Sequence, residues 1–394
     1  MNNFSENELK SRISKLQKFL KDKNLKAAAL TQNSDIYYYT GSCEPLYLVI
    51  QSDNPAFMVS RKAASRIRSE VKHIKLFEFY NSSDLTDIFK NQGLSNLNSI
   101  GFTLDSVSYS TVERLKKIIN FSELIDISFD VRMLRICKSE AELNIQIQAG
   151  KIASYLPELV RKVYKSGMTE LELSAEIENY FRLNGGNLFI RCRKEGVECI
   201  GVCSSGTNSL AGTKFDGICS GLGVSPASPY GANRDVIKKN TPVIIDFGFS
   251  LNGYIVDITR MFSCGAVSET VMNAYNSMVE IEKALLNLLK PGIKWSDVYD
   301  LSLEMAVKAG YQKEFMGCGF EKVRFVGHGI GLELDEPPFL APKQNFLLEE
   351  NMVVAVEPKV ALENIGVVGI ENSYIIRKEN CEIITDCSNE FIVV

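Results

Sequence analysis

The chain has 394 residues, 45% of them hydrophobic and 23% charged, and a formal net charge of −4 at pH 7. This length exceeds what one hydrophobic core usually supports, so two domains are expected. The mild charge and the lack of a basic block argue against a nucleic-acid partner. No apolar run is long enough to span a membrane, and the polar start of the chain differs from a signal peptide, so we expect a cytoplasmic protein. Ten scattered cysteines predict reduced thiols.

The first third of the chain alternates helical and extended patterns. Residues 11–22 carry apolar side chains at the helical period. Short apolar runs of strand length follow at 27–30, 36–41, 46–50, 56–60, 73–79 and 99–103. Helices are predicted at 61–71, 83–91 and 110–118. The alternation predicts an α/β domain over residues 1–130.

A second domain is predicted over residues 131–394, opening with a helix whose capping box consists of Ser139 and Glu142. A faint internal repeat lies within it, because residues 167–186 resemble residues 292–311 at an offset of 125. Each segment is predicted to form a helix that begins after one glycine and ends at another. Two glycine matches can arise by chance, so the repeat supports a domain of two related halves without proving it. Active sites often form between such halves.

Two aspartates lie in the strand–turn–strand segment TPVIIDFGFSLNGYIVDITRMF at 241–262. Pairing the strands across a four-residue SLNG loop predicts that Asp246 lies opposite Asp257, with Cβ atoms about 5 Å apart. A single aspartate at a strand end is usually a turn cap or a solvated group. Two on apolar strands would repel strongly unless one is protonated or a cation lies between them.

A second carboxylate pair follows in VVAVEPKVALENIGVVGIENSYII at 353–376, where a loop centred near residue 364 sets Glu357 opposite Glu371. Between the two hairpins stands GHGIGLELDEPP, whose His328 is one of only two histidines in the chain. Alone, such a histidine is more often a bystander in a loop. With four carboxylates it completes a ligand set for hard or borderline divalent ions. The predicted metal ligands are Asp246, Asp257, His328, Glu357 and Glu371.

These motifs resemble those of the pita-bread metallopeptidases of family M24, which include methionine aminopeptidase, aminopeptidase P and prolidase, with creatinase as a non-peptidase relative. DFGFSLNGYIVDITR is similar to the family segment with two metal-binding aspartates, and GHGIGLELDEPP to its histidine motif. AVEPKV resembles the glutamate–proline motif and GIENSYII the final bridging glutamate. NSDIYYYTGS resembles the creatinase-type N-terminal domain. The resemblance implies an α/β creatinase-like domain followed by an α+β pita-bread catalytic domain with a pseudo-twofold repeat.

The resemblance also implies an activity. It points to a dinuclear metal-dependent hydrolase, an Xaa-Pro aminopeptidase or dipeptidase that removes the N-terminal residue of peptides. In that family a metal-bridging hydroxide attacks the scissile carbonyl, and Glu357 would be the general acid/base. Two divalent ions are implied, with manganese favoured and zinc, cobalt or iron as alternatives. Relatives also suggest a homodimer, and the substrate would be a peptide or a small molecule.

Three positions depart from the family pattern. Asp335 and Tyr230 stand where the peptidases usually have histidines, and Gly369 stands where an arginine is common. In the family these groups contact substrate or stabilise the tetrahedral intermediate, so Tyr230 and Asp335 join Glu357 as candidate catalytic residues. A tyrosine can still donate a hydrogen bond, whereas an ionised aspartate cannot. Losing one oxyanion donor typically costs about 3 kcal/mol, or roughly 100-fold in rate.

These departures leave two alternatives open. One is a creatinase-like hydrolase or lyase acting on a small cationic non-peptide substrate, whose positive group would pair with Asp335. The other is a metal-binding pseudo-enzyme used as a binding module, against which the five intact ligand positions count.

Overall fold

The computed structural model describes residues 4–187, 189–193 and 201–394. Within this part the chain forms two compact units. The N-terminal unit holds residues 4–135 and residue 193, and the C-terminal unit holds the remaining described residues. The nine described cysteines form no disulfide. Among the described residues, no helix combines the length and apolar character that a membrane span needs.

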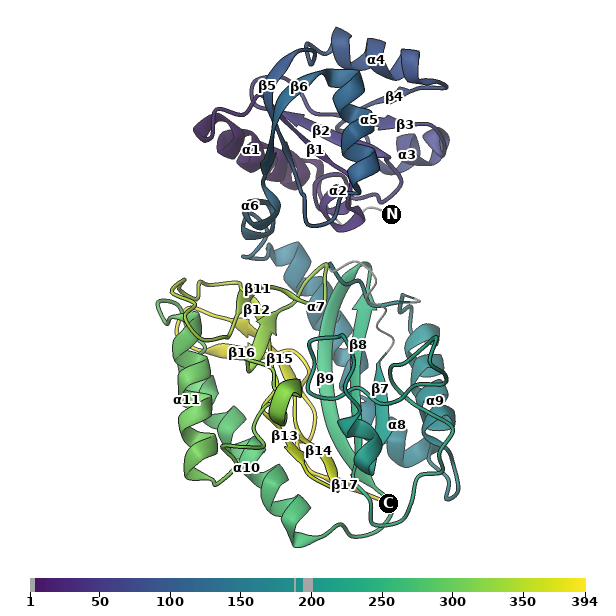
Figure 1. The fold of residues 1–394 in the computed structure, drawn as a ribbon, viewed down its shortest axis with the longest axis vertical. Helices are drawn as coiled ribbons and strands as arrows, with labels where there is room; N and C mark the ends of the chain where they lie inside the picture. Colours follow the sequence, from purple (N-terminus) through teal and green to yellow (C-terminus); the bar gives the residue numbers. More distant parts are fainter. Residues whose placement is uncertain (1–3, 188, 194–200) are drawn as a thin grey trace. The chain divides into compact units, whose positions relative to one another are not determined.

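The N-terminal unit is built on a six-stranded sheet in the order β4-β3-β2-β1-β5-β6, with helices beside it (Figure 1). Alternating apolar residues of the strands and of α4 and α5 form its core. The strands are β1 (Ala27–Leu30), β2 (Tyr47–Gln51), β3 (Phe57–Ser60), β4 (Lys75–Glu78), β5 (Leu97–Phe102) and β6 (Phe121–Asp126). The helices are α1 (Glu6–Asp22), α2 (Asn33–Thr40), α3 (Ala64–Glu70), α4 (Ser82–Asn91), α5 (Tyr109–Ile119) and α6 (Ser128–Met133).

Two elements of this unit differ from the prediction. The run at 36–41, predicted as a strand, lies in helix α2 instead. Three consecutive tyrosines favour a strand locally, but the side chain of Gln32 accepts a hydrogen bond from the Asn33 N–H at the start, and Gly41 ends the helix at a φ of 77°. Strand β6 was not predicted, because its FSELID sequence is largely polar. It is a strand because it pairs in parallel with β5.

The C-terminal unit contains two main sheets, ordered β17-β9-β8-β7 and β11-β10-β12-β15-β16, and a β13-β14 hairpin. Its strands are β7 (Val202–Ser205), β8 (Val243–Leu251), β9 (Tyr254–Ser263), β10 (Gly327–Gly329), β11 (Glu336–Phe339), β12 (Val353–Val356), β13 (Lys359–Leu362), β14 (Gly366–Gly369), β15 (Asn372–Ile376), β16 (Cys381–Ile383) and β17 (Ile392–Val393). Its helices are α7 (Glu140–Ala153), α8 (Leu156–Val163), α9 (Glu170–Leu183), α10 (Glu269–Leu285) and α11 (Trp295–Lys308).

The two halves of this unit meet where β9 approaches β15 (Figure 1). The Asp257 N–H donates to Ser373 Oγ at 2.9 Å, and Thr259 forms a backbone bridge with Glu371. Helix α7 packs along β8 and β9, α9 lies beside β7, and α10 lies beside β13 and β14. The junction of the halves therefore places a predicted ligand from each half side by side.

The internal repeat is visible in the helices. Helix α9 and helix α11 begin and end at positions that differ by 125, the offset predicted from the sequence. The four glycines that flank them all have positive φ, between 86° and 93°. The predicted capping box of α7 is also present, with the Ser139 and Glu142 side chains each accepting the other residue's backbone N–H.

Candidate metal centre

The β8–β9 hairpin carries the two aspartates in a register that differs from the predicted one. Its loop has two residues, Asn252 and Gly253, so Leu251 lies opposite Tyr254. The prediction that Asp246 lies opposite Asp257 is therefore wrong: their partners are Thr259 and Gly248. Asn-Gly is the strongest two-residue hairpin signal, because both positions need positive φ.

The observed register differs from the predicted one by two residues, which is the period of side chains along a strand. The expected site is therefore kept. Asp246 and Asp257 therefore stay on one face of the hairpin as diagonal neighbours. A shift of one residue would have sent one carboxylate to the opposite face.

The second hairpin has the predicted register. Val356 pairs with Asn372 on one side, and Lys359 pairs with Gly369 on the other. Glu357 and Glu371 lie between these two ladders and face each other as expected.

His328 lies in β10, between β11 and β12. A Cβ atom on Gly329 would collide with the backbone of Glu336 and Pro337, so the flanking glycine permits this close approach. The His328 Nδ1 atom lies 3.1 Å from the carbonyl oxygen of Gly329, to which it donates. This contact leaves Nε2 as the acceptor that can bind a metal.

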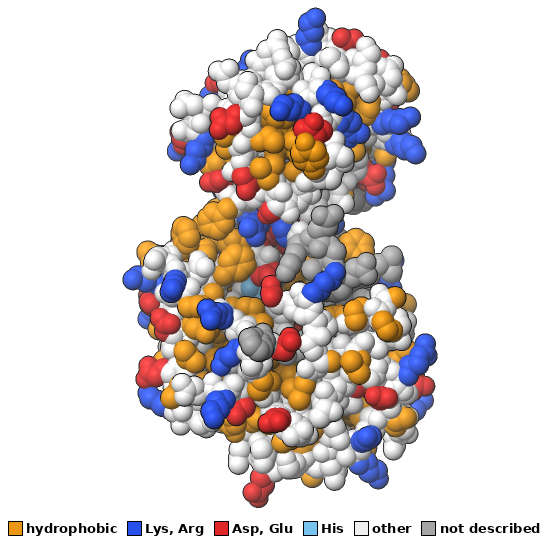
Figure 2. Space-filling model, in the orientation of Figure 1, with side chains coloured by type: hydrophobic (Ala, Val, Ile, Leu, Met, Phe, Trp, Pro, Cys, Tyr) orange, Lys and Arg blue, Asp and Glu red, His pale blue; other side chains and the backbone are white. Residues whose placement is uncertain are grey.

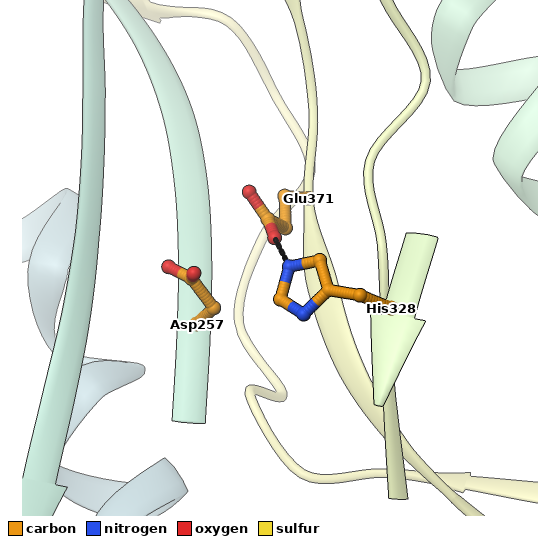
Figure 3. A group of neighbouring side chains, drawn as sticks. All are labelled: Asp257, His328 and Glu371. Atoms are coloured by element: carbon orange, nitrogen blue, oxygen red, sulfur yellow. Dashed lines mark ion pairs between the residues drawn. The ribbon is translucent and has the colours of Figure 1, made fainter. Parts of the chain in front are cut away.

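Three of the predicted ligands form a buried group that fits a divalent ion. Asp257, His328 and Glu371 each offer one ligand atom, and these atoms all lie within 4.8 Å of one another. Figure 3 shows the ring of His328 on β10 facing the carboxylate of Glu371 before β15, with Asp257 on β9 beside them. Within the described part of the chain, the buried Oε1 atom of Glu371 has no hydrogen-bond partner. A buried, unpartnered carboxylate oxygen is costly, and a bound cation would remove that cost.

A lysine lies inside the same cluster, and the sequence analysis missed it. The ammonium of Lys359 lies 3.2 Å from Asp246 Oδ2, 2.6 Å from Glu357 Oε2 and 2.8 Å from Glu371 Oε2. Its side chain is only 1% exposed. One signal was available: Lys359 follows Glu357 by two positions along an extended segment, which places both side chains on one face.

Burial and mutual repulsion dominate the electrostatics of the carboxylates. Burial raises the pKa of Asp257 well above its usual value, and the charges of Glu371 and Asp246 raise it further. Burial raises the pKa of Glu371 to about 7, although the ammonium of Lys359 acts in the opposite direction. For Lys359 itself, burial lowers the pKa, but Asp246, Glu357 and Glu371 outweigh burial and raise it well above its usual value. Lys359 is therefore charged at neutral pH.

His328 experiences the same opposing effects. Burial lowers its pKa, but the nearby charges of Asp335, Glu357 and Glu371 outweigh burial and raise it.

The cluster lies at a pocket that is partly open to solvent. The pocket is lined by all five predicted metal ligands together with Tyr230 and Asp335. Figure 2 shows acidic, basic and hydrophobic side chains mixed on the drawn face of the C-terminal unit.

The other predicted site residues take different places. Asp335 is exposed at the pocket, and the ring of Tyr230 packs edge-on against Phe215 with centroids 5.6 Å apart. Gly369 is not among the lining residues and lies opposite Lys359. A further neighbour that the sequence did not indicate is Cys219, whose Sγ lies 3.1 Å from Asp246 Oδ2. Burial, and then the charge of Asp246, raise the pKa of this thiol well above its usual value, so it stays protonated and donates.

Comparison with known proteins identifies the family. A family model described as Metallopeptidase family M24 matches residues 146–378, more than half of the chain. The chain belongs to metallopeptidase family M24. A second model, Creatinase/Prolidase N-terminal domain, matches residues 12–137 of this M24 metallopeptidase. The expected creatinase-type domain and pita-bread catalytic domain are both confirmed.

Relatives of this M24 metallopeptidase align over nearly its whole length. The Xaa-Pro dipeptidase of Pyrococcus furiosus is 25% identical over 98% of this chain and 100% of its own. An uncharacterized peptidase of Bacillus subtilis, YqhT, is 26% identical over 97% of this chain and all of its own. Among solved structures, the Xaa-Pro dipeptidase from Bacillus anthracis has a TM-score of 0.83 at 25% identity, covering 98% of this chain and 100% of that one. The prolidase from Pyrococcus horikoshii has a TM-score of 0.81 at 25% identity, covering 97% and 100%.

Proposed function

We propose that this M24 metallopeptidase is a metal-dependent Xaa-Pro dipeptidase. The observation that carries the proposal is the buried group of Asp257, His328 and Glu371, whose ligand atoms lie within 4.8 Å of one another at the pocket described above. Relatives named Xaa-Pro dipeptidase, aligned over 98% of the chain, supply the substrate class.

The chain's own residues have distinct roles in this proposal. When bound, a divalent ion supplies a Lewis acid and lowers the pKa of water. Asp257, His328 and Glu371 would hold it. The resemblance to the family makes Glu357 the candidate general acid/base. Its Oε1 atom lies 3.7 Å from His328 Nε2, and its Oε2 atom accepts a hydrogen bond from Lys359. Tyr230 would offer its hydroxyl to the developing oxyanion. Manganese remains the metal favoured by resemblance.

The charges around the pocket suit a substrate with two charged ends. The acidic side chain of Asp216 lines the inner pocket and could receive the free α-amino group. An adjoining outer pocket shares Asp335 and His328 with the inner one. It is also lined by three cations, Lys214, Lys322 and Arg324. Those cations could pair with the carboxylate of a dipeptide, which favours a dipeptidase over an aminopeptidase for longer chains.

One observation favours a second candidate. Asp335 is an exposed carboxylate in the pocket, at the position where the resemblance to the family implies a histidine. A creatinase-like enzyme acting on a small cationic substrate could pair the positive group of that substrate with Asp335.

Cytoplasmic location and a homodimer also remain predictions.

The test is product release from a panel of Xaa-Pro dipeptides and longer Xaa-Pro peptides by the manganese-loaded enzyme. Turnover of the dipeptides that disappears in Glu357→Ala is expected. Preference for the longer peptides would instead support an aminopeptidase. A metal-loaded enzyme that cleaves neither would contradict the peptidase proposal and favour small cationic substrates. An enzyme that binds no metal would favour a pseudo-enzyme.

A further inference from the structure

The ammonium of Lys359 occupies a position in the carboxylate cluster that a metal ion could otherwise take. Its three contacts come from different parts of the fold: Asp246 on β8, Glu357 after β12 and Glu371 before β15. All three distances lie between 2.6 and 3.2 Å, within reach of hydrogen bonds.

A metal ion bound through the same oxygens would exclude this ammonium. Divalent ions bind carboxylate oxygens at about 2.0–2.2 Å, so an ion placed at the centre of the three oxygens would overlap the Lys359 nitrogen. Two cations at such separation also repel strongly in a buried setting. Ammonium and ion are therefore alternative occupants of this position.

The surrounding chain is shaped to hold Lys359 inward. Its cross-strand partner is Gly369, where a Cβ atom would lie 2.5 Å from Lys359 Cγ. The side chain is 1% exposed, so the lysine does not reach solvent from its present position. The absence of a side chain at Gly369 leaves the space that the lysine stem fills.

The oxygens that Lys359 does not use face the other side of the cluster. Glu371 binds the ammonium through Oε2, whereas its buried Oε1 atom has no hydrogen-bond partner within the described part and lies 4.0 Å from His328 Nε2. Glu357 likewise binds the ammonium through Oε2, with Oε1 toward His328 Nε2 at 3.7 Å. The ligand atoms of Asp257, His328 and Glu371, all within 4.8 Å of one another, outline one position for a divalent ion.

We propose that this enzyme binds one divalent ion per chain, at Asp257, His328 and Glu371, and that the Lys359 ammonium replaces a second ion. This inference revises the two-ion expectation drawn from the resemblance. It rests on the proposed metal site and is independent of which substrate is cleaved.

The experiment measures metal content and not activity. Purified protein is incubated with excess Mn²⁺, separated from free ions by gel filtration, and analysed for manganese per chain by mass spectrometry. Electron paramagnetic resonance then distinguishes isolated Mn²⁺ from a spin-coupled pair. The wild type should retain one ion with an uncoupled spectrum. Lys359→Met, which keeps an unbranched apolar stem and removes the ammonium, should retain two ions with a coupled spectrum.

A matched control is Lys308→Met, because Lys308 is an exposed lysine that pairs with Glu304 on the surface of α11. It should retain one ion, like the wild type. Two coupled ions in the wild type would overturn the inference, and so would a folded Lys359→Met protein with only one. If Lys359→Met does not fold, the wild-type stoichiometry and spectrum decide alone. No ion in the wild type would contradict the metal-dependent function itself, so the two failures are distinguishable.

Discussion

Lys359 and Gly369 are direct cross-strand partners in the β13–β14 hairpin, and the lysine stem lies where a side chain on Gly369 would be. The lysine reaches three carboxylates only because this path is open. The space at Gly369 therefore allows the positive charge of Lys359 to offset the negative charge of the carboxylates.

Gly369→Ala should destabilise the protein by about 1–3 kcal/mol, the usual cost of overpacking a buried position. The added Cβ would meet Lys359 Cγ at 2.5 Å and the backbone oxygen of Pro358 at 2.6 Å. The measurement is the free energy of unfolding from denaturant titration. Gly248→Ala is the matched control, since the nearest atoms to its Cβ belong to the Ile190 side chain, at 3.2 Å, and it should cost less. Equal effects of the two substitutions would refute this account.

Removal of a metal ligand should abolish metal retention without unfolding the protein. We expect His328→Ala and Asp257→Asn to weaken Mn²⁺ binding by more than about 100-fold. Mutating a residue that only hydrogen-bonds to a metal ligand already lowers metal affinity about 10- to 100-fold. Isothermal titration calorimetry measures the affinity, and circular dichroism checks the fold. Retention of wild-type affinity in His328→Ala would exclude the histidine from the site.

The metal-free protein should become more stable as the pH is lowered from about 8 to 5. Burial raises the pKa of Glu371 from 4.5 to about 7 in the folded state. A raised pKa contributes stability that is fully present below 4.5 and is lost as the pH rises through about 7. Melting temperatures of chelator-treated protein across this range provide the test. Glu371→Gln should show a flatter profile, and an unchanged slope in that variant would rule out Glu371 as the source.

Asp335→His should raise kcat/KM for Xaa-Pro dipeptides, by up to about 100-fold, if the enzyme is a peptidase that lacks one hydrogen-bond donor at this position. Steady-state kinetics on the dipeptide panel provides the measurement. Asp335→Asn, which removes the charge without adding an imidazole, is the control. A loss of activity in Asp335→His would indicate that the carboxylate itself binds substrate.

Arg324→Gln should raise KM for dipeptides roughly 2- to 5-fold, because a single exposed charge pair contributes up to about 1 kcal/mol. The effect should vanish for the same substrates with an amidated C-terminus. Lys308→Met provides the control, because Lys308 does not line the outer pocket and pairs with Glu304 at the surface. An equal increase for free and amidated substrates would contradict recognition of the carboxylate by Arg324.

Much of the fold followed from local patterns. The apolar runs predicted five of the six strands of the N-terminal sheet, and glycines flanking α9 and α11 predicted both helices at their observed offset. Helix α2 and strand β6 did not follow, because tyrosines favour strands and FSELID is too polar to signal one. In both, tertiary packing and pairing outweighed local propensity.

The sequence by itself determined which groups form the candidate centre, since carboxylates on paired strands and a histidine between glycines are readable from spacing. It left the β8–β9 register two residues in error, which the alternation of side chains tolerated. Only the tertiary structure decided that Lys359 enters the cluster. Its ammonium needs carboxylates from three separate segments and the space at Gly369, and that coincidence exists only once the two halves have packed together.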